Sequence, residues 1–90
     1  MKKREEIKKV QTPCIEWLGD EGYTVHRLGG DGWPDVVVLD HFLTNHFYIE
    51  FKDPKGELSN RQVRKIRKLT EEGATVYVVC SLAQLQEGLK

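Results

Sequence analysis

The sequence predicts a single α/β domain, spanning residues 1–90, in which helices flank a mixed β-sheet in the order α-β-β-β-α-β-α. Its 90 residues suit one domain and leave no room for a second. Apolar residues recur at helical spacing in the segments 3–19 and 60–72, whereas the runs 35–39 and 75–80 are β-branched. Because a helical segment separates the last two strands, we expect those strands to be parallel.

The first helix is predicted over residues 3–19. Its apolar side chains recur at helical spacing: Ile7, Val10, Cys14, Trp17 and Leu18. Gly19 and Gly22 mark the end of the helix. Pro13 lies inside this segment and removes a backbone donor, so we expect a kink or a break near Thr12.

Three extended segments follow the first helix. Residues 23–28 are predicted to be extended, and the glycine-rich run 29–32 after them forms a loop. Residues 35–39 form a β-branched run, and residues 47–52 alternate in polarity. A short connection containing Thr44 and Asn45 joins these two segments, which predicts an antiparallel hairpin.

A second helix is predicted to run from Asn60 to about Glu72. Ser59 and Gln62 have the spacing of a capping box at its start. The expected inner stripe consists of Val63, Ile66, Leu69 and Thr70. Residues 75–80 predict the last strand, and a similar cap at Ser81 predicts a short final helix ending near Gly88.

Charge and composition narrow the function classes. Fourteen basic and fourteen acidic residues cancel, which argues against nucleic-acid binding by bulk charge alone. The basic residues are nevertheless clustered in segments 2–9 and 61–68. The sequence contains no membrane span or signal core, and Cys14 and Cys80 form no CxxC pair, so a cytoplasmic protein is expected. The thin core of so small a chain also makes a homodimer an expectation.

The candidate site lies on the predicted hairpin. Glu50 and Lys52 are two residues apart in one strand and therefore share a face, opposite the apolar set Phe47, Ile49 and Phe51. If Asp35 pairs nearby across the hairpin, two carboxylates converge and favour Mg²⁺ or Mn²⁺. The main-chain carbonyl of Phe51 could add a ligand, and Lys52 could supply positive charge to the nucleophile. Such an arrangement is suited to phosphodiester hydrolysis.

Several motifs in order closely resemble the VRR-NUC domain, a branch of the PD-(D/E)xK nuclease superfamily. They are Gly32-Trp-Pro-Asp35, Ile49-Glu-Phe-Lys52, Gly56-Glu-Leu-Ser59-x-x-Gln62, and Gly73 before the strand Val76–Val79. The resemblance spans nearly the whole chain. It implies a restriction-endonuclease-like core and Mg²⁺- or Mn²⁺-dependent cleavage of DNA. It also implies metal ligation by Asp35 and Glu50, a catalytic Lys52 and an active-site role for Gln62.

The resemblance also bears on partners. VRR-NUC members of this length are typically stand-alone domains of phages and bacteria, and some resemble Holliday-junction-resolving enzymes that act as dimers. The family places a glutamate of the first helix in the metal site. Helical geometry favours Glu6, which lies beside Val10 and Trp17, over Glu5, which points away. We therefore expect a homodimer that cuts branched DNA, with Glu6 as a further metal ligand.

Other interpretations of these residues remain open. Glu50 and Lys52 could form an ordinary surface ion pair, and Glu6 could belong to a solvated face. Gln62 could be entirely structural, as part of the capping box. The basic residues Arg61, Lys65 and Lys68 could be a solvated helix face or could meet DNA phosphates. Trp33 could pack over the loop or face a nucleotide, with packing the default.

Two rival functions follow from the same residues. A DNA-binding module that does not cut could keep this fold, although clustered acids that repel phosphate argue against it. The second rival is a different enzyme that uses the same ion, either a nuclease acting on RNA, since no residue distinguishes DNA from RNA, or a phosphatase-like hydrolase. The histidines His26, His41 and His46 do not form a convincing zinc set.

Overall fold

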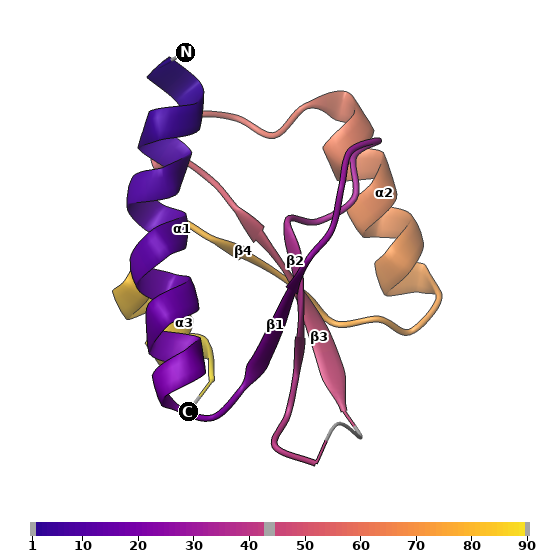
Figure 1. The fold of residues 1–90 in the computed structure, drawn as a ribbon. Helices are drawn as coiled ribbons and strands as arrows, with labels where there is room; N and C mark the ends of the chain where they lie inside the picture. Colours follow the sequence, from indigo (N-terminus) through magenta and orange to yellow (C-terminus); the bar gives the residue numbers. More distant parts are fainter. Residues whose placement is uncertain (1, 43–44, 90) are drawn as a thin grey trace.

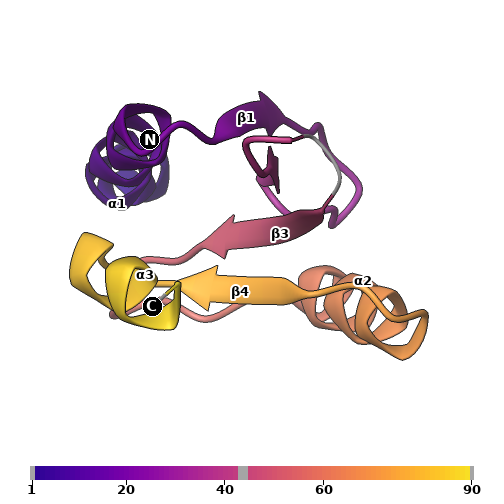
Figure 2. The same cartoon turned by 90° about the horizontal axis from the view of Figure 1, so that it is seen from below.

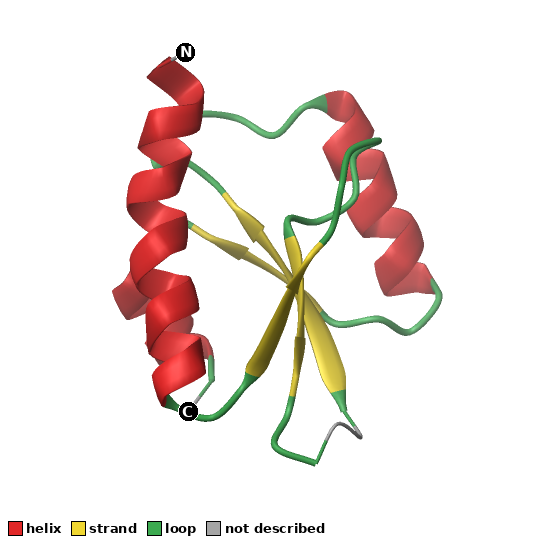
Figure 3. Ribbon diagram, viewed as in Figure 1, coloured by secondary structure: helices red, strands yellow, loops and turns green. Residues whose placement is uncertain are grey.

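The computed structural model describes residues 2–42 and 45–89, with side chains described from Ile7 onward. Its elements are α1 (Lys2–Asp20), β1 (Thr24–Arg27), β2 (Val36–Leu39), β3 (His46–Phe51), α2 (Asn60–Glu71), β4 (Val76–Val79) and α3 (Leu82–Gly88) (Figure 1). This confirms the predicted α/β class and the predicted element order. Coloured by secondary structure, the chain shows helices around one central sheet (Figure 3).

The four strands form one mixed sheet in the order β1-β2-β3-β4. β1 pairs with β2 and β2 pairs with β3 in antiparallel orientation, whereas β3 and β4 are parallel. The predicted hairpin and the parallel crossover through α2 are therefore confirmed. Thr44, part of the predicted turn, lies outside the described residues.

Helices cover both faces of the sheet. Figures 1 and 2 place α1 and α3 together on one face and α2 on the other. The core lies between the sheet and the two helices α1 and α3. Its buried members are Val10, Cys14, Leu18, Val36, Val38, Ile49, Phe51, Val79 and Leu85. The prediction that Ile49 and Phe51 mark the core face of β3 is correct.

The expected break at Pro13 is absent, because α1 is one continuous helix from Lys2 to Asp20. Proline costs a helix one backbone hydrogen bond. Val10, Cys14 and Leu18 follow one another at four-residue spacing and are all buried. This apolar stripe extends on both sides of Pro13, so packing against the sheet holds the two halves in line.

The inner face of α2 differs from the predicted one. Leu69 is buried, but Val63 and Thr70 are exposed. Gln62 occupies the position that faces the sheet, since it contacts Glu50, and Leu69 lies two turns further along the same face. The inner face is therefore shifted toward Gln62 but still includes Leu69, and Val63 and Thr70 lie on the exposed side of the helix.

The two cysteines are free. Cys14 is fully buried, and burial raises the pKa of its thiol to about 11, so it behaves as a small core residue. Cys80 is only partly buried. Within residues 2–42 and 45–89, no helix has the length and apolar character needed to cross a bilayer.

Candidate active site

The two predicted acidic residues face one another across the β2–β3 hairpin. The strand register pairs Val37 with Tyr48 and Val36 with Ile49. Continuing this register by one step sets Asp35 directly opposite Glu50 on the face that α2 covers. The main-chain N–H of Phe51 donates to Asp35 Oδ2 over 2.7 Å, which holds the Asp35 side chain against β3. The predicted convergence of the two carboxylates is therefore present in the structure.

Glu50 is buried, which the sequence did not predict. Its side chain is 2% exposed, because α2 covers the face of β3 on which Glu50 lies. Oε2 accepts a hydrogen bond from Gln62 Nε2 over 2.9 Å. Oε1 is buried without a hydrogen-bond partner. A buried charged oxygen left unpaired is costly, so this atom marks the place where a proton or a cation would be bound.

Burial and mutual repulsion govern the protonation of both carboxylates. Burial raises the pKa of Glu50 to about 8, and the negative charge of Asp35 and a side-chain hydrogen bond between the two carboxyl groups add to the increase. Burial also raises the pKa of Asp35, although the Phe51 N–H, the side-chain hydrogen bond with Glu50 and the positive charge of Arg27 act in the opposite direction. Without a metal, the pair therefore retains a proton at a pH where exposed carboxyl groups are fully ionised.

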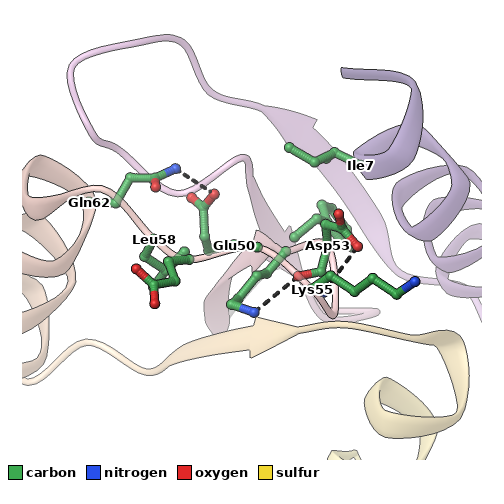
Figure 4. Close-up of a pocket in the computed structure, with 10 residues that line it drawn as sticks. Ile7, Glu50, Asp53, Lys55, Leu58 and Gln62 are labelled. Atoms are coloured by element: carbon green, nitrogen blue, oxygen red, sulfur yellow. Dashed lines mark hydrogen bonds between the residues drawn. The ribbon is translucent and has the colours of Figure 1, made fainter. Parts of the chain in front are cut away.

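Gln62 forms the capping box and also contacts Glu50. The side-chain Oε1 of Gln62 accepts from the main-chain N–H of Ser59 over 2.8 Å. The main-chain N–H of Gln62 donates to Ser59 Oγ over 3.1 Å, which completes the capping box. Because the cap uses Oε1, the amide Nε2 is turned toward Glu50 (Figure 4). The helix cap thus fixes the orientation of the Glu50 carboxylate.

Lys52 does not form the surface ion pair with Glu50 that was the alternative interpretation of these two residues. Its Nζ instead donates to the carbonyl oxygen of Asp53 over 3.0 Å. β3 ends at Phe51, and the chain then turns, with Gly56 N–H donating to the same carbonyl over 2.9 Å. Strand alternation therefore no longer fixes where the Lys52 side chain points. Lys52 nevertheless lines the pocket beside Glu50.

A pocket of about 210 Å³ opens beside Glu50, at the end of β3 (Figure 4). It is lined by Ile7, Glu50, Phe51, Lys52, Asp53, Lys55, Gly56, Glu57, Leu58 and Gln62. Asp35 is not part of this lining and approaches Glu50 from the β2 side. Ile7 brings the first turns of α1 to the pocket, whereas the side chain of Glu6, the predicted helix ligand, lies outside the described residues.

No family model and no curated protein matches the sequence. Among solved structures, one described as a VRR_NUC domain superimposes with a TM-score of 0.81 and 26% sequence identity, covering 93% of this chain and 94% of that chain. The chain belongs to the VRR-NUC family. This confirms the predicted family, and the coverage shows that the likeness extends along nearly the whole domain rather than one motif.

The residues of this VRR-NUC domain fit a hard divalent cation. Among the described residues, no three His, Cys, Asp or Glu side chains gather as a metal site, so Asp35 and Glu50 form the acidic set. Mg²⁺ commonly binds through one or two carboxylates and retains waters and substrate oxygens. The unpartnered Glu50 Oε1 supplies an oxygen for such an ion. The Phe51 N–H contacts Asp35, which places the main chain of this residue beside the acidic pair.

Two of the three predicted basic residues of α2, Arg61 and Lys65, contact the loop that precedes β2. Arg61 lies 3.7 Å from Asp31, with both side chains mostly exposed. Lys65 Nζ lies 4.7 Å from the centre of the Trp33 ring. Lys68 is exposed in the last turn of α2. Arg27 was not predicted as a site residue, although its positive charge acts on Asp35. The β1–β2 register, which sets Arg27 opposite Val36, is the feature that would have indicated it.

Proposed function

We propose that this VRR-NUC protein is a metal-dependent DNA endonuclease, a finer assignment than the PD-(D/E)xK nuclease type that family membership supports. The observation that carries the proposal is the buried Glu50 oxygen without a partner, directly beside a second carboxylate. A buried carboxylate oxygen without a donor costs stability, and its position beside Asp35 supports a role in binding a cation. The proposed reaction is hydrolysis of a phosphodiester bond at this position.

Each residue has a separate part in the proposed reaction. Asp35 and Glu50 would hold Mg²⁺ or Mn²⁺, with the Phe51 carbonyl as a neutral ligand and Glu6 as a further predicted one. When bound, such an ion polarises a phosphate oxygen and lowers the pKa of a water. Gln62 keeps the Glu50 carboxylate oriented. Lys52 adds positive charge near the pocket, where negative charge develops on the phosphate.

The proposed substrate is branched DNA, and the proposed active form is a homodimer that presents one site to each of two strands. The support is the resemblance of short VRR-NUC members to junction-resolving enzymes, together with a core that covers only one face of the sheet well. The basic side of α2, formed by Arg61, Lys65 and Lys68, would position the DNA through its phosphates.

A cleavage assay with metal removal tests the proposal. The purified protein is incubated with branched DNA, linear duplex and matched RNA in Mn²⁺, and a parallel series contains EDTA. We expect cleavage of branched DNA in Mn²⁺, no cleavage in EDTA and none by the Asp35→Ala variant. Cleavage that survives Asp35→Ala would come from a contaminant. Cleavage of RNA alone, or DNA binding without cleavage, would instead favour one of the two rival functions.

Replacing Gln62 separates its two roles. Gln62→Ala removes the contact to Glu50 and half of the capping box, whereas Ser59→Ala removes the other half of the box alone. Both variants should lose about 1 kcal/mol of stability. Gln62→Ala should also lower the cleavage rate by about 10- to 100-fold, the range for groups that orient metal ligands. Equal cleavage rates for the two variants would show that Gln62 is only a cap.

Charge reversal tests the basic side of α2. The double variant Lys65→Glu/Lys68→Glu should weaken DNA binding and reduce the slope of log affinity against log salt by about 2, one unit for each lost phosphate contact. Lys8→Glu/Lys9→Glu is the matched control, because it changes the net charge equally on exposed positions of α1. A salt slope that is unchanged in the first variant, or reduced equally in both, would rule out a DNA-facing α2.

A further inference from the structure

Trp33 is held at the surface immediately before the active-site strand. The loop 29–34 leads from β1 into β2, and the Trp33 side chain is 40% exposed. One aromatic neighbour lies nearby, since the ring centres of Trp33 and Tyr48 are 6.5 Å apart at a tilt of 45°. Lys65 Nζ lies over the indole at 4.7 Å from its centre. The indole thus packs against Tyr48 of the sheet on one side, and a long lysine side chain rather than a core residue covers the ring.

Backbone geometry fixes the position of the indole. Gly30, Asp31 and Gly32 all have positive φ angles, and the Trp33 N–H donates to the Gly30 carbonyl over 3.1 Å. A Cβ atom at Gly32 would lie 2.9 Å from the main-chain oxygen of Arg61, so the loop packs directly on the first turn of α2. A ring held in this way loses little conformational freedom when it binds a partner.

The indole lies along the same interface as the acidic pair. Tyr48 and Glu50 are two residues apart on the face of β3 that α2 covers, which corresponds to about 7 Å. On α2, Lys65 follows Gln62 by one helical turn. Trp33 therefore sits about one step along the sheet from the carboxylates, within reach of a nucleotide next to the phosphate being cut.

Two cations of α2 that contact the loop 29–34 have weak partners in the free protein. Lys65 interacts with the Trp33 ring, and Arg61 pairs with Asp31 at 3.7 Å while both side chains remain largely exposed. Exposed ion pairs and exposed cation–π contacts contribute little stability. Phosphate groups would therefore compete successfully for both side chains.

From these features we infer that Trp33 is a stacking site for an unpaired nucleobase of the substrate strand, with Lys65 leaving the indole for a neighbouring phosphate as the base takes its place. The inference rests on the proposed nuclease function, and it specifies that the DNA bound next to the site contains an unpaired base. An unpaired base offers a free π-face, whereas a base within a duplex is covered by its neighbours. The ligand is accordingly a single-stranded or unpaired segment of DNA.

Tryptophan fluorescence tests the stacking directly. Trp17→Phe leaves Trp33 as the single tryptophan, because the chain has two. Single-stranded oligonucleotides and blunt duplexes of the same sequence are titrated in Ca²⁺, with gels confirming that the DNA stays intact. We expect single strands to quench Trp33 and blunt duplexes to leave it nearly unchanged. In the wild-type background, Trp33→Ala should lower the affinity for single strands by about tenfold or more, the size of one lost stack.

Two controls separate stacking from structure. Trp33→Phe keeps an aromatic ring and should restore most of the affinity for single strands. Phe42→Ala removes another exposed aromatic, at the opposite end of β2, and should have no effect. Thermal unfolding followed by circular dichroism compares the folding of all variants. A folded Trp33→Phe that binds as poorly as Trp33→Ala would contradict stacking on this ring.

Failure of the inference differs from failure of the proposed function. Unchanged Trp33 fluorescence at saturating single-stranded DNA would overturn the inference. An equal loss of affinity for single strands and blunt duplexes in Trp33→Ala would overturn it as well. In either case, metal-dependent cleavage that requires Asp35 would leave the nuclease assignment intact. A protein that neither binds nor cuts any of these nucleic acids would overturn both.

Discussion

Replacing Glu50 by Gln is expected to remove DNA cleavage and to raise the thermal stability of the metal-free domain. The amide would be neutral and could still accept from Gln62 Nε2, while its own NH₂ group could donate to Asp35. This relieves the cost of a buried carboxylate beside a second one. The loss of a ligand to the proposed ion removes several kcal/mol of transition-state stabilisation, or about 1,000-fold in rate.

Single-turnover cleavage in Mn²⁺ and thermal unfolding in EDTA at pH 8.5 measure the two effects. Glu57→Gln is the matched control, since Glu57 lines the same pocket but is exposed and its loss changes the net charge equally. We expect that control to leave both cleavage and unfolding temperature nearly unchanged. A Glu50→Gln variant that still cuts, or that unfolds at a lower temperature than the control, would contradict the proposed site.

The metal-free domain is expected to lose stability as the pH rises from about 4.5 to about 8. Burial and Asp35 raise the pKa of Glu50 from 4.5 to about 8 in the folded state. Within this window the folded chain binds more protons than the unfolded chain, so the free energy of unfolding decreases with pH. The raised pKa of Asp35 acts in the same direction. Below pH 4.5, Glu50 is protonated in both the folded and the unfolded chain, and its stabilising contribution to the free energy of unfolding is fully present.

Urea unfolding in EDTA at pH 5, 6.5 and 8.5 tests this dependence. The wild type should be least stable at pH 8.5, and Glu50→Gln should show a flatter profile because its side chain does not titrate. Mn²⁺ should restore stability most strongly at the highest pH, since the ion replaces the proton between the carboxylates. A wild-type stability that rises over this range in EDTA would show that Glu50 is not the dominant titrating group.

The hairpin and its acidic residues could be predicted because short-range patterns specify them. Alternation along β3 separates Ile49 and Phe51 from Glu50, and the hairpin register sets Asp35 opposite Glu50. The burial of Glu50 could not be predicted in this way. It depends on α2, which reaches the site through a crossover and covers the second face of the sheet. The alternation of residues within one strand carries no information about whether a distant helix packs on its second face.

The remaining differences also arise where local pattern and tertiary contact compete. Lys52 follows the last residue of β3, so the period of two no longer applies to it. Val63 was expected inside because it is apolar, but the contact of Gln62 with Glu50 sets the rotation of α2. Pro13 was expected to break α1, and the core contacts of Cys14 and Leu18 outweigh its missing hydrogen bond.

The thin attachment of α2 has a consequence for how the domain responds to heat. Leu69 is the buried residue of this helix, whereas the sheet and α1 share the main core. Elements with few buried apolar contacts open before the rest of a domain. On warming, α2 would detach first and withdraw Gln62 from Glu50, leaving the other layers assembled. Enzymatic competence would then disappear at a temperature where most of the secondary structure persists.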